Sequence, residues 1–594
     1  MNALFLDAFL DGVNHCIATQ PLPVEYTLLG FTPAPFTRKD CIAVMGYVAY
    51  SFADGIKRDS LYTILEPFLT RADLDLIFPA YTLNNHTTVM NPQGVGKEAL
   101  AVASTKKSPN ILGSVHGKKA HEFTGFTRAY QRLLDQTAKI FPPFTGSNSW
   151  VLGPGKTKSG HAILANDPHI GIANPGVWYE AHLSYPGYEN YGYHLPLMPF
   201  PMLAHNTTKA WAITMFENDD LDLYAETFHP EKKDEVKFKG QWVKIKTLKE
   251  EIKVKGENNV ILTIRITPHG PVISDFLTGY TGRPVSVSWV YHKLDNPILD
   301  VVYGMGKAEN MDQFRTALSK LAAPGLNISY IDHSGNIGWW AAGRVPIRAG
   351  QVSGKKIHNG GSGAEEWSGY LPFEKNPQME NPENSMIITA NNLPTMIPID
   401  PIGVLTGYFR PSDRAARIHE LLSKEEKWDM EGLKKIQVQS RDALIVAGFK
   451  AGVKELCDRY GTDQSQWTWG SVHTIEFVHA MGRKKPLNRL FNVGPFASPS
   501  EFTSVNKLKS KTGSHDYKVA SLPSTRRLID CNDPDNSWSI IPTGNSGNFM
   551  SPFYDDQAQM FITGTYRKIL YAKEQFSQTP SYELILNPEQ AAEK

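Results

Sequence analysis

The first quarter of the chain carries apolar residues at helical spacing. Over residues 1–20 they recur at three- and four-residue intervals until two prolines stop the pattern: Leu4, Phe5, Phe9, Val13, Cys16, Pro21 and Pro23. This spacing predicts a helix. Similar apolar faces at 43–52, 61–68 and 130–140 predict further helices. Residues 82–117 are polar and rich in glycine, so we expect a surface excursion or a linker peptide there.

The pattern changes to short strands near residue 147. Residues 162–165, 209–214 and 285–290 are β-branched or aromatic runs, and 236–266 alternates around turn signals at Lys239-Gly240 and Lys255-Gly256. Alternation of this kind predicts strands and hairpins. Helical spacing returns at 311–318, 415–422, 429–436 and 443–453. We therefore divide the chain into a mainly helical part, 1–146, and a part built on antiparallel sheets, 147–594.

The amino-acid composition limits the classes of binding partner that the chain is expected to have. The chain has 594 residues, enough for more than one hydrophobic core. Its 61 basic and 60 acidic side chains give a net charge of +1, so no long-range field favours nucleic acid or an anionic membrane. No apolar run approaches the ~18–20 residues needed to span a bilayer. The four cysteines form no C-x-x-C motif and say little about compartment.

The most informative motif is Ser147-Asn148-Ser149-Trp150, directly after Gly146. If the chain cuts itself before Ser147, one residue gains both a hydroxyl and a free amine. That amine, with a reference pKa of roughly 7.7–8.0, can act as base for its own hydroxyl. Gly146 lacks a Cβ and so permits strained backbone and a close approach by Ser147 Oγ. Taken alone, the motif is also compatible with a serine in a tight turn.

Other motifs follow in a fixed order along nearly the whole chain. They include Asn166-Asp167-Pro168-His169, His205-Asn206, Gly335-Asn336-Ile337-Gly338, Thr389-Ala390-Asn391-Asn392, Asp413-Arg414 and Gly544-Asn545-Ser546-Gly547. One such motif is weak support, but the ordered set is specific. On these residues the chain resembles the penicillin acylase family of N-terminal-nucleophile hydrolases.

The resemblance implies a fold and a reaction. The fold class is α+β, a four-layer αββα sandwich whose α and β chains come from one precursor cut at Gly146–Ser147. The reaction is hydrolysis of a small-molecule linear acyl amide, of the penicillin or N-acyl homoserine lactone type, through an acyl-Ser147 intermediate. No cofactor is expected for the chemistry. The family also implies a periplasmic or extracellular protein, although residues 1–7 lack the features of a signal peptide.

The resemblance also assigns roles beside Ser147. Asn391 corresponds to a side-chain donor of the oxyanion hole, and Met215, counted from the flanking motifs, to a backbone N–H donor. Arg414 corresponds to an organiser of the active site, and His169 to a histidine that tunes Ser147. Each has a plainer interpretation: an Asn-Asn turn, a core methionine, a surface salt bridge and a structural histidine.

Four apolar residues are candidates for an acyl pocket. Phe52 matches an aromatic residue at the pocket wall of the family, and we expect Val48, Ile170 and Leu203 beside it. Residues of this type are also common in hydrophobic cores. The prediction is therefore an apolar slot whose members serve packing as well.

Asp219 and Asp222 resemble part of the family's calcium site, because two carboxylates with a carbonyl between them suit a hard cation. However, Arg58 stands where the family often has a glutamate, which argues for a weak or absent structural calcium site.

Two other function classes stay open. An inactive, unprocessed family member would act as a binding protein. A conventional serine hydrolase would use a histidine base, although the chain has neither a G-x-S-x-G elbow nor an H-E-x-x-H zinc helix.

Overall fold

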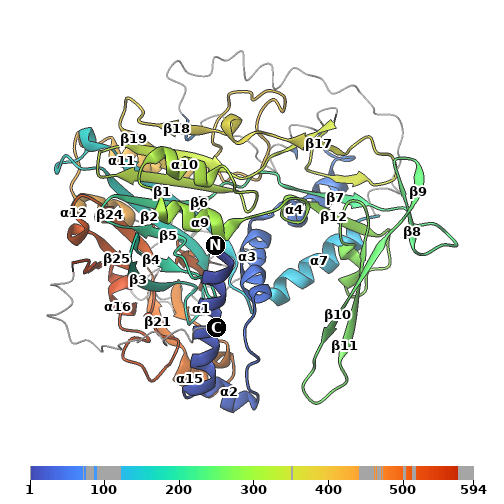
Figure 1. Ribbon diagram of the computed structural model, residues 1–594, viewed down its shortest axis with the longest axis horizontal. Coiled ribbons are helices and arrows are strands. Elements are labelled where there is room, and N and C mark those ends of the chain that lie inside the picture. Colours follow the sequence, from blue (N-terminus) through green and yellow to red (C-terminus); the bar gives the residue numbers. More distant parts are fainter. Residues whose placement is uncertain are drawn as a thin grey trace, which may run out of the picture.

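A computed structural model describes residues 2–70, 73–74, 86–89, 122–138, 140–349, 352–439, 461, 463, 470, 473–498, 504–510 and 517–572. Two large sheets, of eight and seven strands, occupy the centre of these residues, together with helices and smaller sheets (Figure 1). No helix among them is long and apolar enough to cross a membrane.

The first sheet contains the predicted nucleophile. Its main path runs β19-β1-β2-β24-β25-β26, with β23 on β2 and β22 on β23, all antiparallel. The strands are β1 (Phe144–Leu152), β2 (Ile163–Gly171), β19 (Met386–Thr389), β22 (Lys509–Ser510), β23 (Val519–Pro523), β24 (Arg526–Asp530), β25 (Trp538–Ile540) and β26 (Arg567–Lys568). Helices α11 (Asp413–Leu422) and α12 (Met430–Gln437) contact this sheet, and α16 (Ala558–Thr563) shares its outer core.

Successive side chains of β1 pack alternately in two different hydrophobic cores. Trp150 and Leu152 pack in a cluster with residues of α11 and α12, whereas Val151 packs with residues of the second sheet. Because successive side chains of a strand point to opposite faces, Ser147, like Val151, faces the space between the sheets.

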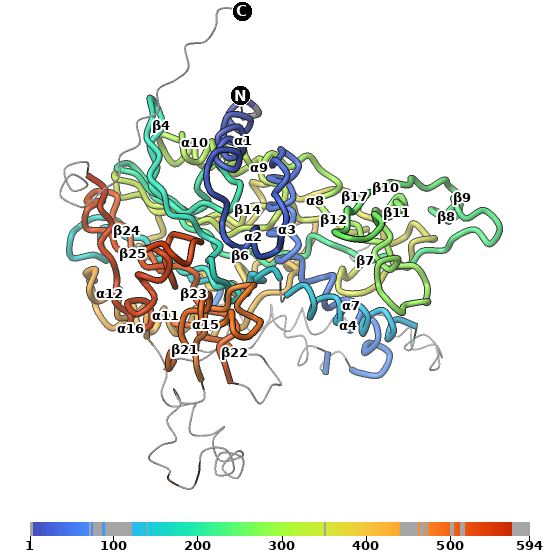
Figure 2. The backbone as a smooth tube through the Cα atoms, turned by 90° about the horizontal axis from the view of Figure 1, so that it is seen from below, coloured from blue at the N-terminus to red at the C-terminus, as the bar shows by residue number. Residues whose placement is uncertain are grey.

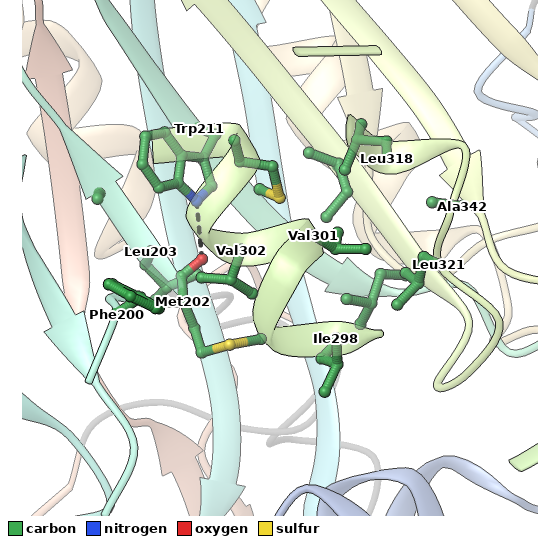
Figure 3. Close-up of a cluster of buried hydrophobic side chains, with 14 of the residues drawn as sticks. Phe200, Met202, Leu203, Trp211, Ile298, Val301, Val302, Leu318, Leu321 and Ala342 are labelled. Carbon is green, nitrogen blue, oxygen red and sulfur yellow. Dashed lines mark hydrogen bonds between the residues drawn. The ribbon is translucent and has the colours of Figure 1, made fainter. Parts of the chain in front are cut away.

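The second sheet has the order β18-β14-β13-β6-β5-β4-β3. Its strands are β3 (Tyr179–Tyr185), β4 (Tyr188–His194), β5 (Leu203–His205), β6 (Lys209–Met215), β13 (Leu326–Asp332), β14 (Ile337–Ala342) and β18 (Gln378–Glu380). Strands β6 and β13 contact β1 and β2. Helices α9 (Ile298–Lys307) and α10 (Met311–Leu318) bury Ile298, Val302 and Leu318 against this sheet, where Trp211 Nε1 donates to Met202 O at 2.9 Å (Figure 3).

A smaller sheet, β12-β7-β16, lies beside the helices that precede β1. Its strands are β7 (Leu221–Ala225), β12 (Val285–Trp289) and β16 (Ile357–Asn359), and its core includes residues of α3 (Arg38–Phe52), α4 (Gly55–Leu65) and α7 (Thr124–Thr137). Helix α1 (Asn2–Thr19) packs on α3 and α9, and Figure 2 shows these three helices side by side. Three short α-helices lie elsewhere: α2 (Val24–Leu29), α8 (Val290–Lys293) and α15 (Asn488–Phe491). Four strand pairs complete the described strands: β8 (Glu235–Phe238) with β9 (Gln241–Lys244), β10 (Lys246–Ile252) with β11 (Val260–Ile266), β15 (Pro346–Arg348) with β17 (Trp367–Tyr370), and β20 (Thr474–Phe477) with β21 (Val493–Ala497).

Most predicted elements are confirmed. The helices at 1–20 and 43–52 correspond to α1 and α3, and the alternation at 236–266 forms the hairpins β8-β9 and β10-β11. The predicted helix at 61–68 only overlaps α4, which begins at Gly55 and ends at Leu65. Helix α7 begins and ends earlier than the predicted 130–140. The predicted helix at 443–453 and most of 82–117 lie outside the described residues. The proposed boundary between 146 and 147 falls inside strand β1.

Candidate active site

Ser147 lies near the start of β1 and is 4% exposed. Its Oγ–H donates to the Gly146 carbonyl oxygen at 2.6 Å, so the hydroxyl lies against the peptide bond that would be cut. Across the strand pair stands Pro168, which has no N–H and so cannot bond to the Ser147 carbonyl. The hydrogen bonds to the Ser147 backbone therefore come from side chains of other segments.

Gly146 has a backbone conformation that other residues rarely adopt, with φ at +143°. A Cβ at this position would lie 2.9 Å from Asn391 Oδ1 and 3.3 Å from Lys507 Nζ. Glycine is thus needed here both for its φ angle and for the space that these two polar groups fill.

Asn391 follows β19 and holds Ser147 from one side. Its Oδ1 accepts the Ser147 N–H at 2.6 Å, and its Nδ2 donates to the Met215 carbonyl oxygen at 3.1 Å. Its φ is +66°, a left-handed conformation that asparagine tolerates better than most residues. The predicted oxyanion residues Asn391 and Met215 are therefore neighbours, and the contact between them is made through the Met215 carbonyl oxygen.

Arg414, the second residue of α11, is 3% exposed. Its Nη1 donates to Ser147 O at 2.7 Å and to Asn148 Oδ1 at 2.5 Å, while Nη2 donates to Ala390 O at 2.7 Å and to Asn391 Oδ1 at 3.1 Å. The forked guanidinium thus joins β1 to the segment after β19. Its burial excludes the surface salt bridge that the sequence also allowed.

His169 pairs with Gly146 across β1 and β2, but its side chain contacts Asp167, with Nε2 2.8 Å from Oδ2. Burial, reinforced by the Lys507 and Arg414 cations, holds the His169 pKa well below its usual value. Burial also raises the Asp167 pKa to about 8, although Gln437 and Asn148 donate hydrogen bonds to its carboxyl group. His169 is therefore a neutral imidazole in a buried polar cluster, which matches its structural interpretation.

The four predicted acyl-pocket residues share one hydrophobic cluster. Val48 and Phe52 come from α3, Ile170 from β2 and Leu203 from β5. The Phe52 ring centroid lies 5.6 Å from that of Phe144, three residues before Ser147. The four residues therefore belong to one buried hydrophobic cluster, which Phe144 of β1 joins.

Asp219 and Asp222 lie together, as predicted, but they face an arginine. Arg348 Nη2 is 2.7 Å from Asp222 Oδ1 and 3.1 Å from Asp219 Oδ1, and it also donates to the Asp219 carbonyl oxygen at 3.1 Å. Trp367 Nε1 donates to Asp222 Oδ2 at 2.6 Å. These are the oxygens that a calcium ion would use. Because a guanidinium already occupies their shared face, the residues present do not fit a calcium ion at this position.

Sequence reasoning missed three residues of these clusters. Asp167 stands in the Asn166-Asp167-Pro168-His169 motif but received no role of its own. Lys507 and Arg348 belong to no motif. The contact of Lys507 with Thr145 spans 362 residues, and that of Arg348 with Asp222 spans 126. No local pattern could have indicated either pair.

The family model described as penicillin amidase matches residues 2–444 and 435–578. The chain belongs to the penicillin amidase family.

Curated relatives of this family member are enzymes. Penicillin acylase 2 proenzyme of Pseudomonas sp. (strain SE83) is 30% identical over 428 residues, which is 70% of this chain and 51% of the relative. Acyl-homoserine lactone acylase QuiP of Pseudomonas aeruginosa is 26% identical over 460 residues, 75% of this chain and 51% of the relative. The chain thus spans about half the length of these relatives.

A solved structure supports the fold. The thermostable penicillin G acylase from Alcaligenes faecalis superposes with a TM-score of 0.56 at 18% identity, covering 75% of this chain and 100% of that chain. At this identity the likeness concerns the fold, and the functional argument rests on the site.

Proposed function

We propose that this penicillin amidase family member is a self-cleaving N-terminal-nucleophile amide hydrolase with a four-layer αββα fold. The observation that carries the proposal is the arrangement around one bond. Ser147 Oγ lies against the Gly146 carbonyl, and both Asn391 and Arg414 hold the Ser147 backbone. The contacts of α11 and α12 with one sheet and of α9 and α10 with the other support the layer order.

Self-cleavage begins with an N→O acyl shift. Ser147 Oγ attacks the Gly146 carbonyl carbon, the Oγ–C bond forms and the C–N bond breaks, and the hydroxyl proton ends on the Ser147 nitrogen. Water then hydrolyses the ester, which gives a Gly146 carboxylic acid and restores the Ser147 hydroxyl. The product has a free Ser147 amine beside its own Oγ.

The same hydroxyl then hydrolyses an external amide. Ser147 Oγ attacks the substrate carbonyl while the Ser147 amine takes the proton and passes it to the leaving amine. Asn391 Nδ2 and the Met215 N–H stabilise the oxyanion, and water releases the acyl group from the Ser147 ester. In the uncut chain Nδ2 is bonded to Met215 O, so this bond has to open before Asn391 can serve the substrate.

The proposed substrate is a small molecule with a linear acyl amide. The cluster that contains Val48, Phe52, Ile170 and Leu203 offers an apolar wall for the acyl chain. Relatives named penicillin acylase and acyl-homoserine lactone acylase support two substrate types, penicillins and N-acyl homoserine lactones.

Intact mass, N-terminal sequencing and turnover test this proposal together. We expect the pure wild-type chain to give a large fragment that begins at Ser147, and burst release of a chromophore from an acyl-coupled substrate. Ser147→Ala should remain uncut and inactive, and Ser149→Ala on the same strand is the matched control that should be cut. Wild-type protein that stays whole and only binds acyl amides would instead identify a binding protein, and a whole chain with full activity would refute the mechanism.

A further inference from the structure

Three side chains from three different segments hold backbone groups on the two sides of the Gly146–Ser147 bond. Asn391 accepts the Ser147 N–H and Arg414 donates to the Ser147 carbonyl. On the other side of the bond, Lys507 Nζ donates to the Thr145 carbonyl oxygen at 3.0 Å. The first two follow from the proposed function, whereas the lysine has no assigned role.

Lys507 is 3% exposed and lies on a segment tied to β1 at a second point. Asn148 Nδ2 donates to Val505 O at 2.9 Å, so residues 505 and 507 both contact the strand of the nucleophile. Burial, reinforced by repulsion from Arg414, holds the Lys507 pKa well below its usual value. Lysine is among the residues least often fully buried, and burying its charge is costly. A lysine retained at this place is therefore expected to serve a purpose other than stability.

The contact with Thr145 fixes a particular part of the backbone. The Thr145 carbonyl belongs to the planar peptide that joins Thr145 to Gly146, so a bond to this oxygen sets the orientation of that plane. Gly146 φ, at +143°, is the next rotation along the chain and links this plane to the peptide between Gly146 and Ser147. Because Ser147 itself is held, fixing the plane before Gly146 limits how far the Gly146–Ser147 peptide can turn about Ser147 φ, which is the rotation that sets the carbonyl carbon relative to Oγ. Asn391 and Arg414 fix the far side of the same carbonyl. With Lys507 in place, the peptide to be cut is held from both ends.

We propose that Lys507 is a positioning residue of self-cleavage, which holds the Thr145–Gly146 peptide so that the Gly146 carbonyl carbon faces Ser147 Oγ. This inference rests on the proposed function. Near-attack positioning is sensitive to small shifts, and a misplacement of about 1 Å costs about 100-fold in rate. Self-cleavage should therefore depend on Lys507 more strongly than hydrolysis of an external amide does, because an external substrate is not attached to Thr145.

The experiment compares full-length chains with Lys507→Met, Lys507→Arg and Lys509→Met. Each is purified, checked by circular dichroism and urea unfolding, and followed by SDS gel and intact mass for the rate of cutting before Ser147. Methionine has a similar length but no donor, arginine keeps a donor and the charge, and Lys509 is a lysine of the same segment. We expect cutting to slow about 100-fold in Lys507→Met, to be largely restored in Lys507→Arg, and to be unchanged in Lys509→Met.

A second measurement separates positioning from a general structural role. Turnover of an acyl-coupled chromophore is divided by the amount of cut protein, and in Lys507→Met this quantity should fall much less than the rate of cutting. An equal fall in both, or cutting at the wild-type rate, would overturn the proposal.

A second variant is used if the circular dichroism spectrum of Lys507→Met shows that it does not fold like the wild type. Lys507→Gln then replaces it in the comparison. Because the glutamine amide is shorter and does not reach the Thr145 oxygen, this variant should also be cut slowly. A wild-type chain that is never cut would overturn the proposed function and this inference together, whereas a cut wild type with an equally fast Lys507→Gln would overturn the inference alone.

Discussion

Replacing Arg348 should turn a site closed to calcium into one that responds to calcium. Arg348 side-chain atoms are 5% exposed, and the two carboxylates that they face are fully buried. In Arg348→Met, Asp219 and Asp222 would face each other with their shared cation removed. A buried charge that loses its partner is strongly destabilising.

The magnitude follows from the contacts. Arg348 makes charge-assisted hydrogen bonds to Asp222 from Nη2 at 2.7 Å and from Nε at 2.9 Å. Such bonds contribute about 1.5–3 kcal/mol each, so the two together amount to about 3–6 kcal/mol. Breaking a buried ion pair by removing one partner costs about 3–5 kcal/mol. We therefore expect the free energy of unfolding to fall by about 4 kcal/mol in EDTA.

Calcium should recover part of this loss in the variant. The oxygens released by Arg348→Met are those of Asp219 and Asp222, including the Asp219 carbonyl. With a dissociation constant of about 10⁻⁴–10⁻³ M, 10 mM calcium would return about 1.4–2.7 kcal/mol. The wild-type chain should show no such gain, because its guanidinium already occupies the shared face.

The assay is urea unfolding followed by tryptophan fluorescence, with EDTA and with 10 mM calcium chloride. Arg344→Met is the matched control, since Arg344 Nη2 donates at 3.2 Å to the neutral Ser319 carbonyl; it should cost about 1 kcal/mol and show no calcium response. A wild-type chain whose unfolding midpoint rises with calcium as much as that of Arg348→Met would refute the reasoning. A loss below about 1 kcal/mol in Arg348→Met would equally show that Arg348 is not the cation on which the carboxylates depend.

Further predictions concern the active site. Gly146→Ala should slow self-cleavage at least about tenfold, seen as uncut chain on a gel, because the new Cβ would lie 2.9 Å from Asn391 Oδ1 and φ is +143°. Asn391→Gly keeps the left-handed backbone but removes the donor, so kcat should fall about 100- to 1,000-fold; kcat within a factor of three of wild type would exclude Asn391 from the oxyanion hole. Phe52→Ala should lower kcat/KM about 10- to 100-fold for amides with large acyl groups and much less for acetyl amides, measured with matched chromogenic substrates. Asp167 has a pKa of about 8 when folded against about 3.9 when unfolded, so its contribution to stability is complete below about pH 4 and is lost as the pH rises to 8. Asp167→Asn removes this dependence on pH. The urea unfolding midpoint of the variant should therefore rise relative to that of the wild type between pH 5 and pH 8, and the same pH dependence in both proteins would contradict the raised pKa.

Periodicity predicted the elements whose pattern is strong and local. The helix at 1–20, the hairpins at 236–266 and the helices at 311–318, 415–422 and 429–436 are all present. Helix α9 was missed because Val301-Val302, Gly304 and Gly306 lower its helix propensity. It forms because Ile298, Val301 and Val302 bury their side chains against the second sheet.

The residues of the candidate site also fall into those that a local motif predicts and those that only the fold reveals. Asn391 and Arg414 could be predicted because each stands in a motif, and the structure brings both to Ser147. Lys507 and Arg348 depend on contacts between distant segments, so only the folded chain reveals them. The resemblance also suggested a calcium ion at Asp219 and Asp222, but a resemblance in two ligands says nothing about a guanidinium that arrives from another strand.

The charges around Ser147 connect the two proposed reactions. Arg414 is buried beside Ser147, while the buried Asp167 carboxyl group is kept largely neutral at neutral pH by its raised pKa. Positive charge near an amine disfavours its protonation. An amine released at Ser147 would therefore stay unprotonated and able to accept the hydroxyl proton, and the same positive charge would stabilise an oxyanion. Groups that hold the uncut peptide in place thus provide the electrostatic environment that a free N-terminal serine needs.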